Sequence, residues 1–202
     1  SPGAKSNKQH SIGNLMHRRN LLSQLLEYKN RYPDEQATVE RFMAFVQSQP
    51  RCFERDCWQG HVTGSAWLVD PQGEALLLTH HRKLNMWLQL GGHSDGDADT
   101  QRVAVREAQE ESGLAVVVLS PSIFDLDIHE IPGHKSDPAH FHFDVRYVLQ
   151  AQSAAFVVSD ESVDLSWVAL TELEQYTREY SILRMREKWI AHDYSAGSGN
   201  SG

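Results

Sequence analysis

The chain has 202 residues, of which 40% are hydrophobic and 23% charged, so it can form a sizeable core and cannot be wholly disordered. Nineteen Lys and Arg against 27 Asp and Glu give a net charge of −8. That sign is wrong for a general binder of nucleic-acid backbones, and no apolar run approaches the roughly 18 residues of a membrane span. We therefore expect neither a nucleic-acid polymer nor a membrane as a partner. Cys52 and Cys57 are too few for a disulfide framework, which favours reduced thiols in a cytoplasmic protein.

Two helices are predicted before Pro50. The first spans residues 15–31, and its apolar face is formed by Leu15, Leu22, Leu25 and Leu26. The second follows Asp34, which we expect to be its N-cap. Its apolar residues are Val39, Phe42, Met43 and Val46. Neither stripe can bury itself, so the pair should cover the main domain or the second subunit of a homodimer.

Strands and helices alternate from residue 60 onward. Strands are predicted over residues 61–70, 74–81, 87–90, 114–119, 123–131, 140–150 and 164–169. Helices are predicted over 99–112, 171–176 and 181–191. This order predicts the α/β class, with an α/β/α sandwich around a mixed sheet. The expected parts are a flexible lead, a helical appendage, the main domain and a Gly/Ser-rich flexible tail, over 1–12, 13–59, 60–192 and 193–202.

One predicted helix breaks the usual charge rules. Glu107, Glu110 and Glu111 fall within an arc of about 100° on one face, where like charges repel each other. They also lie in the last turns before Gly113, where the helix dipole favours cations. A solvated acidic face is the plain alternative. A divalent cation would resolve the conflict, because Mg²⁺ binds carboxylate and carbonyl oxygens, and Mn²⁺ is a second option.

Residues beside these glutamates support the metal interpretation. Gly92, in the pair before the helix, can bring its carbonyl close because it has no Cβ atom. Arg106 can hold the Glu107 carboxylate through charge-assisted hydrogen bonds. Small apolar residues form the adjoining helix face, which suits close packing against a sheet: Ala104, Val105 and Ala108.

This segment, GGHSDGDADTQRVAVREAQEESGL, resembles the Nudix box, G-x5-E-x7-R-E-U-x-E-E-x-G-U, in which U is a bulky aliphatic residue. The matching residues are Gly92, Arg106, Glu107, Glu110, Glu111, Gly113 and Leu114. Two positions depart, because Ala98 stands at the first glutamate and Ala108 at the first U. Asp97 and Asp99 flank Ala98; we expect Asp99 to cap the helix and leave Asp97 open between capping and metal binding.

The resemblance implies metal-dependent cleavage of a diphosphate linkage in a nucleoside-diphosphate-type or related phosphorylated small molecule. The glutamates of the box and the Gly92 carbonyl would hold the metal, and Arg106 would orient Glu107. One of the glutamates, Glu110 among them, or the distant Glu161 would be the base. The rival is a Nudix-fold sensor that binds a nucleotide without cleaving it. An isomerase of allylic diphosphates would need a cysteine in the strand region, where none lies.

Polar side chains that alternate with apolar ones predict a substrate-binding wall. His140, His142, Asp144 and Arg146 share one side of a strand. Asp125, Asp127 and His129 form a second polar face upstream. His93 and Trp87 flank the glycine pair and join the predicted substrate contacts. The alternatives are a solvated strand pair, or a second metal site built from His140, His142 and Asp144.

Overall fold

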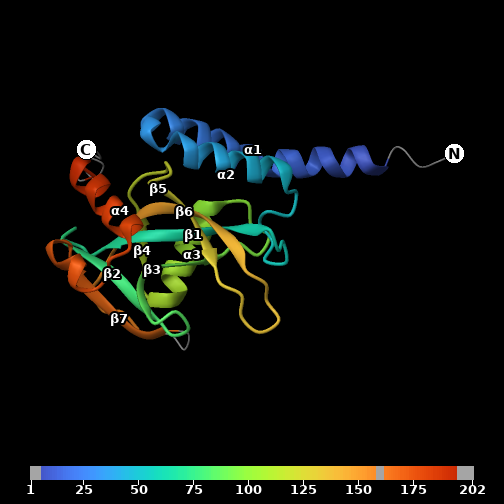
Figure 1. The fold of residues 1–202 in the computed structure, drawn as a ribbon. Helices are drawn as coiled ribbons and strands as arrows, with labels where there is room; N and C mark the ends of the chain where they lie inside the picture. Colours follow the sequence, from blue (N-terminus) through green and yellow to red (C-terminus); the bar gives the residue numbers. More distant parts are fainter. Residues whose placement is uncertain (1–5, 158–161, 195–202) are drawn as a thin grey trace. The chain divides into compact units, whose positions relative to one another are not determined.

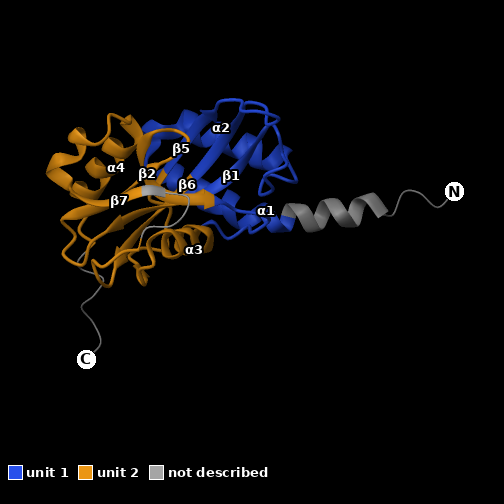
Figure 2. Cartoon of the chain, turned by 90° about the horizontal axis from the view of Figure 1, so that it is seen from below, with its two compact units in different colours: residues 1–63, 93–100, 126–144 blue, residues 64–92, 101–125, 145–202 orange. Residues whose placement is uncertain are grey.

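The computed structural model describes residues 6–157 and 162–194, with side chains over 16–157 and 164–194. The chain divides into two compact units, coloured separately in Figure 2. The first contains residues 1–63, 93–100 and 126–144. The second contains residues 64–92, 101–125 and 145–202. Strands pass from one unit into the other, so each unit is described here from its own contacts.

The described strands form one seven-stranded sheet in the order β4-β6-β1-β3-β2-β7, with β5 paired to β6 (Figure 1). Their bounds are Gly60–Val69 (β1), Ala75–His81 (β2), Met86–His93 (β3), Val116–Val118 (β4), Asp125–Ile131 (β5), His140–Ala151 (β6) and Ser162–Ala169 (β7). β2 pairs antiparallel with both β3 and β7. All seven predicted strands are confirmed. β3 is longer than predicted because the paired glycines continue it, and β4 is shorter.

The second unit is a sandwich in which helices cover both faces of its strands (Figure 2). Alternate residues of one strand enter different cores, as the pleat of a strand requires. On one face, residues such as Trp67 and Leu76 pack with Ile182 and Met185 of α4 (Tyr180–Ala191). On the other face, Leu68, Leu77 and Leu149 pack with Ala108 of α3 (Thr100–Ser112). The predicted α/β sandwich is thereby confirmed, and the helix predicted over 171–176 is the 3₁₀ helix Leu170–Gln175.

The first unit contains the helix pair, α1 (Ser6–Arg31) and α2 (Gln36–Ser48). Figure 1 shows the two helices side by side. The buried residues of α2 include Val39, Phe42 and Val46, as predicted. Phe45 stacks on Phe143 of β6 with the ring centroids 3.9 Å apart, so α2 covers part of a strand. The apolar face of the pair therefore has a partner within the same chain.

Two details of the predicted helix pair are wrong. Leu26 is exposed, and the buried face of α1 is formed by Leu21, Leu25 and Tyr28. Asp34 does not cap α2, because it lies inside a short 3₁₀ helix, Pro33–Glu35, that leads into α2. Pro33 fixes the first turn of that element, so α2 begins two residues after Asp34 without a side-chain cap.

Candidate active site

α3 presents the acidic cluster, and its local structure follows from the sequence. Val103, Ala104 and Ala108 are fully buried and hold the helix by its apolar side. Gly113 ends the helix with a φ of 70°, a left-handed conformation that glycine adopts without steric cost. Its N–H donates to the carbonyl of Gln109 at 2.8 Å, which satisfies one of the last helix carbonyls. The face of α3 that carries the glutamates is thus fixed in direction.

The Glu107 carboxylate lies directly against the backbone of Gly92, within the second unit. A Cβ atom built on Gly92 would come 2.6 Å from Oε2 of Glu107, so no other residue fits there without a shift. The Glu107 side chain is only 19% exposed, and Nη2 of Arg106 donates to its Oε1 at 3.4 Å. Glu111 is half-buried and Glu110 is exposed. Gly92, Arg106 and Glu107 therefore lie in contact with one another.

This arrangement fits a hard divalent cation. The donors that the segment offers are carboxylate oxygens and a backbone carbonyl, which Mg²⁺ prefers over nitrogen or sulfur. The space that a side chain would occupy on Gly92 is taken by the Glu107 carboxylate. Glu107 and Glu111, four residues apart, share a helix face, which is unfavourable for two carboxylates unless a cation lies between them.

Comparison with known families identifies the main domain. The model of the NUDIX domain matches residues 60–187, which is more than half of the chain. The chain belongs to the Nudix family. None of the curated proteins compared with it matches. The matched range begins at β1 and ends within α4, so it contains the whole of α3 and the first part of α4.

Solved Nudix structures resemble the chain over about two thirds of its length. A NUDIX-family hydrolase from Clostridium perfringens has 25% sequence identity and a TM-score of 0.50, covering 65% of this chain and 97% of that one. A MutT protein from Methanosarcina mazei Go1 has 18% identity and a TM-score of 0.51, covering 65% and 94%. An Ap4A hydrolase of C. elegans has 15% identity and a TM-score of 0.50, covering 67% and 98%. The last two show the fold alone.

The Nudix box departs from the family pattern at Ala98, in the loop between β3 and α3. Ala98 is half-buried and carries no donor atom. The carboxylate of Asp97 accepts the backbone N–H of Asp99 at 2.9 Å, which forms an Asx turn. Asp99 directly precedes α3, which is the position of an N-cap, and its capping role stays a prediction. The Asx turn accounts for an aspartate at position 97 without a role as a metal ligand.

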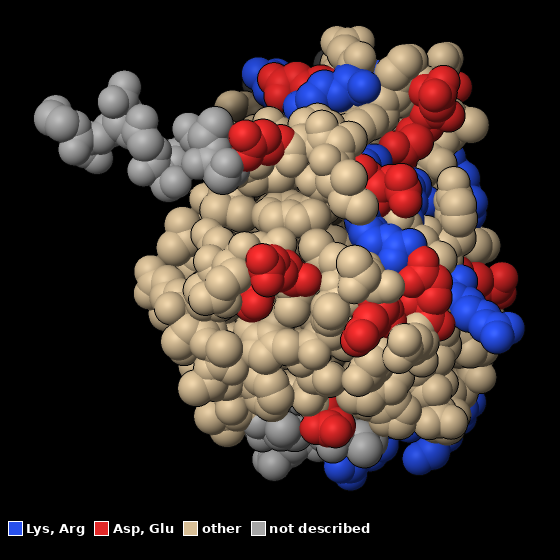
Figure 3. Space-filling model, turned by 90° about the vertical axis from the view of Figure 1, so that its left-hand side faces the viewer, with Lys and Arg blue, Asp and Glu red and all other residues tan. Residues whose placement is uncertain are grey.

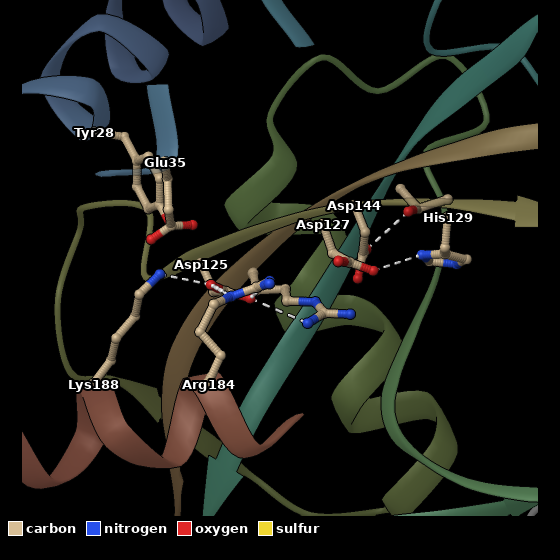
Figure 4. Close-up of polar contacts among 10 residues, drawn as sticks. Tyr28, Glu35, Asp125, Asp127, His129, Asp144, Arg184 and Lys188 are labelled. Atoms are coloured by element: carbon tan, nitrogen blue, oxygen red, sulfur yellow. Dashed lines mark hydrogen bonds and ion pairs between the residues drawn. The ribbon is translucent and has the colours of Figure 1, made fainter. Parts of the chain in front are cut away.

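The residues predicted to form a substrate wall are divided between two clusters. Asp125, fully buried, binds three cationic side chains within the second unit (Figure 4). It accepts from Nη1 of Arg146 at 3.1 Å, Nη2 of Arg184 at 2.7 Å and Nζ of Lys188 at 2.6 Å. Burial opposes ionisation, but the Arg184 hydrogen bond and the nearby cations outweigh it, so the pKa of Asp125 is lowered. The structure places Arg146 in this buried ion-pair network.

Five histidines gather in the first unit. They are His61 on β1, His93 at the end of β3, His129 on β5, and His140 and His142 on β6. Nε2 of His140 lies 3.3 Å from Nε2 of His142. Burial, followed by the charges of the neighbouring imidazoles, lowers the pKa of His142 to about 2 and that of His61 to about 4. Both imidazoles are therefore neutral at pH 7.

The remaining predicted contacts have other surroundings. Asp144 accepts from the hydroxyl of Thr63 at 2.8 Å, and Asp127 bonds Nδ1 of His129 at 3.0 Å (Figure 4). Trp87 packs edge-on against Tyr176, with the ring centroids 5.3 Å apart. Glu161, the alternative base, lies outside the described residues. Both cysteines are free and buried.

The sequence interpretation missed His61, Arg184 and Lys188. His61 appears in the sequence only as the start of a predicted strand, and its relation to β6 depends on the strand order. Arg184 and Lys188 are four residues apart on one helix, a spacing that places both on the same face. That spacing was a usable signal for a buried acidic partner.

The face in Figure 3 carries acidic and basic groups next to one another over its upper and right-hand parts, and its described basic residues form no continuous patch. Within the described ranges, no helix has the length and hydropathy to cross a membrane.

Proposed function

We propose that this Nudix protein hydrolyses a diphosphate linkage in a small phosphorylated molecule, such as a nucleoside diphosphate derivative, with Mg²⁺ as its cofactor. The observation that carries the proposal is the contact between Gly92 and Glu107. The half-buried carboxylate of Glu107 lies against the backbone of Gly92, and the helix of Glu107 also carries Glu110 and Glu111. On a purely solvated acidic face, the carboxylate would not need to touch a glycine. Here a single methyl group on Gly92 would displace the Glu107 carboxylate.

The residues of the chain have definite tasks in this proposal. Glu107, Glu111 and the Gly92 carbonyl would hold the cation, and Glu110 is the exposed carboxylate that can accept a proton from water. Arg106 keeps Glu107 in place through its guanidinium. The bound cation would supply charge neutralisation of the diphosphate and activation of water, which an acidic chain cannot provide with its own side chains.

The test measures hydrolysis by the full chain with nucleoside diphosphate sugars, dinucleoside polyphosphates and nucleoside triphosphates, with Mg²⁺ or Mn²⁺. We expect Glu107→Gln and Glu111→Gln each to lower kcat by about 10²-fold or more, since each removes a charge from the metal site. Glu187→Gln, the same change at an exposed position of α4, is the matched control and should keep full activity. Activity insensitive to EDTA, or unchanged in both variants, would refute the mechanism.

The rival function, binding without cleavage, gives a different result in the same assay. Ala98 at the first glutamate of the box is the observation that favours it. A sensor would bind a nucleotide, measured by calorimetry, and release no product with any of the substrates and either metal.

A further inference from the structure

The histidine cluster of the first unit has a geometry that the Nudix box does not explain. The ligand atoms of His61, His140 and His142 all lie within 4.8 Å of one another. Two come from β6 and one from β1, and these strands are neighbours in the sheet. We propose that His61, His140 and His142 form a binding site for one zinc-class transition-metal ion.

The shortest distance in the cluster matches a tetrahedral metal site. Zinc–nitrogen bonds of 2.0–2.1 Å at tetrahedral angles separate two ligand nitrogens by about 3.3 Å. Nε2 of His140 and Nε2 of His142 are 3.3 Å apart. A hydrogen bond between the two rings would explain this pair alone, but it would leave the third imidazole without a function.

His61 supplies the independent observation. The residue is 2% exposed, and its Nε2 has no hydrogen-bond partner among the described residues. Buried polar atoms nearly always have a partner, so an imidazole nitrogen that lacks one inside a histidine cluster points to a missing ligand. One ligand nitrogen from each of the three imidazoles already lies within 4.8 Å of the other two, so the proposal requires a small side-chain adjustment when the ion binds.

Contacts on the opposite ring nitrogens orient the cluster. Nδ1 of His140 lies 3.0 Å from the carbonyl oxygen of Pro138, and Nδ1 of His61 lies 3.5 Å from that of Cys57. In the neutral tautomer in which each Nδ1 donates to its carbonyl oxygen, the lone pair lies on Nε2, where it can bind a metal ion. Backbone carbonyls perform this task for metal-binding histidines in general.

The donor set predicts which metal binds. Three neutral imidazoles suit Zn²⁺, Co²⁺, Ni²⁺ or Cu²⁺, whereas Mg²⁺ and Mn²⁺ prefer the oxygen donors of the Nudix glutamates. The chain would therefore carry two kinds of metal site with opposite preferences. Asp144, once a candidate ligand with His140 and His142, is bound instead to the Thr63 hydroxyl and is replaced by His61.

The experiment titrates the metal-free full chain with Co²⁺, whose visible absorption reports tetrahedral nitrogen coordination, and then displaces it with Zn²⁺. We expect one Co²⁺ per chain and displacement by Zn²⁺ but not by Mg²⁺. His140→Gln and His142→Gln should each weaken Zn²⁺ binding at least about tenfold, since even outer-shell changes cost that much. The control is His134→Gln, an exposed histidine of the same unit, which should bind as the parent does.

A second pair of variants separates this site from the Nudix box. The double variant Glu107→Gln/Glu111→Gln should lose hydrolysis yet keep the Co²⁺ spectrum. Loss of the spectrum in this double variant, or its retention in both His140→Gln and His142→Gln, would overturn the proposal. Circular dichroism of each metal-free variant shows that it is folded. His140 and His142 are only half-buried, so the test does not depend on substituting the fully buried His61.

Discussion

At the scale of single residues, the contact between Gly92 and Glu107 makes a specific prediction about metal affinity. Gly92→Ala places a methyl group 2.6 Å from the Glu107 carboxylate, which must then rotate away. Because that carboxylate is the end of a flexible side chain, folding should change by less than about 1 kcal/mol. We expect the Mg²⁺ concentration for half-maximal hydrolysis to rise at least about tenfold. A variant with normal metal dependence but a lower melting temperature would show that Gly92 serves only packing.

Asp125 makes a second prediction at this scale, on stability. Asp125→Asn leaves three buried or half-buried cations without their carboxylate, so unfolding free energy at pH 7 should fall by about 3–5 kcal/mol. The folded pKa of Asp125 is lowered, so the unfolded chain takes up the proton first as the pH falls through about 4. The advantage of the parent is therefore complete above that pH and shrinks below it.

Urea denaturation from pH 7 to pH 2.5 measures this difference. Asp137→Asn, at an exposed position, is the control and should stay within about 0.5 kcal/mol of the parent at every pH. A constant gap between the parent and Asp125→Asn down to pH 2.5 would show that the ionised carboxylate is not what stabilises the network.

At the scale of elements, one buried arginine joins the two N-terminal helices. Nη1 of Arg18 on α1 donates to the last carbonyls of α2, those of Val46 at 2.6 Å and Gln47 at 2.8 Å. A cation at a helix C-terminus also interacts favourably with the helix dipole. Arg18→Ala should lower unfolding free energy by about 2–3 kcal/mol, whereas Arg19→Ala, exposed on the same helix, should change it little. Equal effects of the two substitutions in urea denaturation would contradict this assignment.

The elements themselves were largely predictable from sequence, and the clusters that they form were not. Alternation located β6 and a period of 3.6 located α3, because these patterns depend only on which side of an element is buried. The Nudix box was readable because its residues are near in sequence. His61 was not readable as a ligand, because it is 79 positions from His140 and 81 from His142, and their proximity depends on β1 lying beside β6. The partners of Asp125 likewise depend on how α4 packs on the sheet.

At the scale of the whole molecule, the helix pair should be required for a soluble protein. Phe143 of β6 is 4% exposed because Phe42 and Phe45 of α2 pack against it. Deleting residues 1–50 removes both helices and would expose the ring of Phe143 to water. We expect the shortened chain to aggregate in size-exclusion chromatography with light scattering, since exposed apolar patches of this kind favour association.

The matched control removes residues 195–202, a Gly/Ser-rich stretch beyond Tyr194, whose ring stacks on Trp189 at 5.1 Å. That deletion keeps the stacked pair and should leave the oligomeric state and the activity unchanged. The comparison also tests the predicted boundary near residue 60, where the matched family model begins. If the chain without residues 1–50 keeps the oligomeric state of the parent and hydrolyses substrate at the parent rate, the Nudix domain folds alone. That result would show that the packing of Phe45 on Phe143 is dispensable, because β6 would remain folded with Phe143 exposed to water.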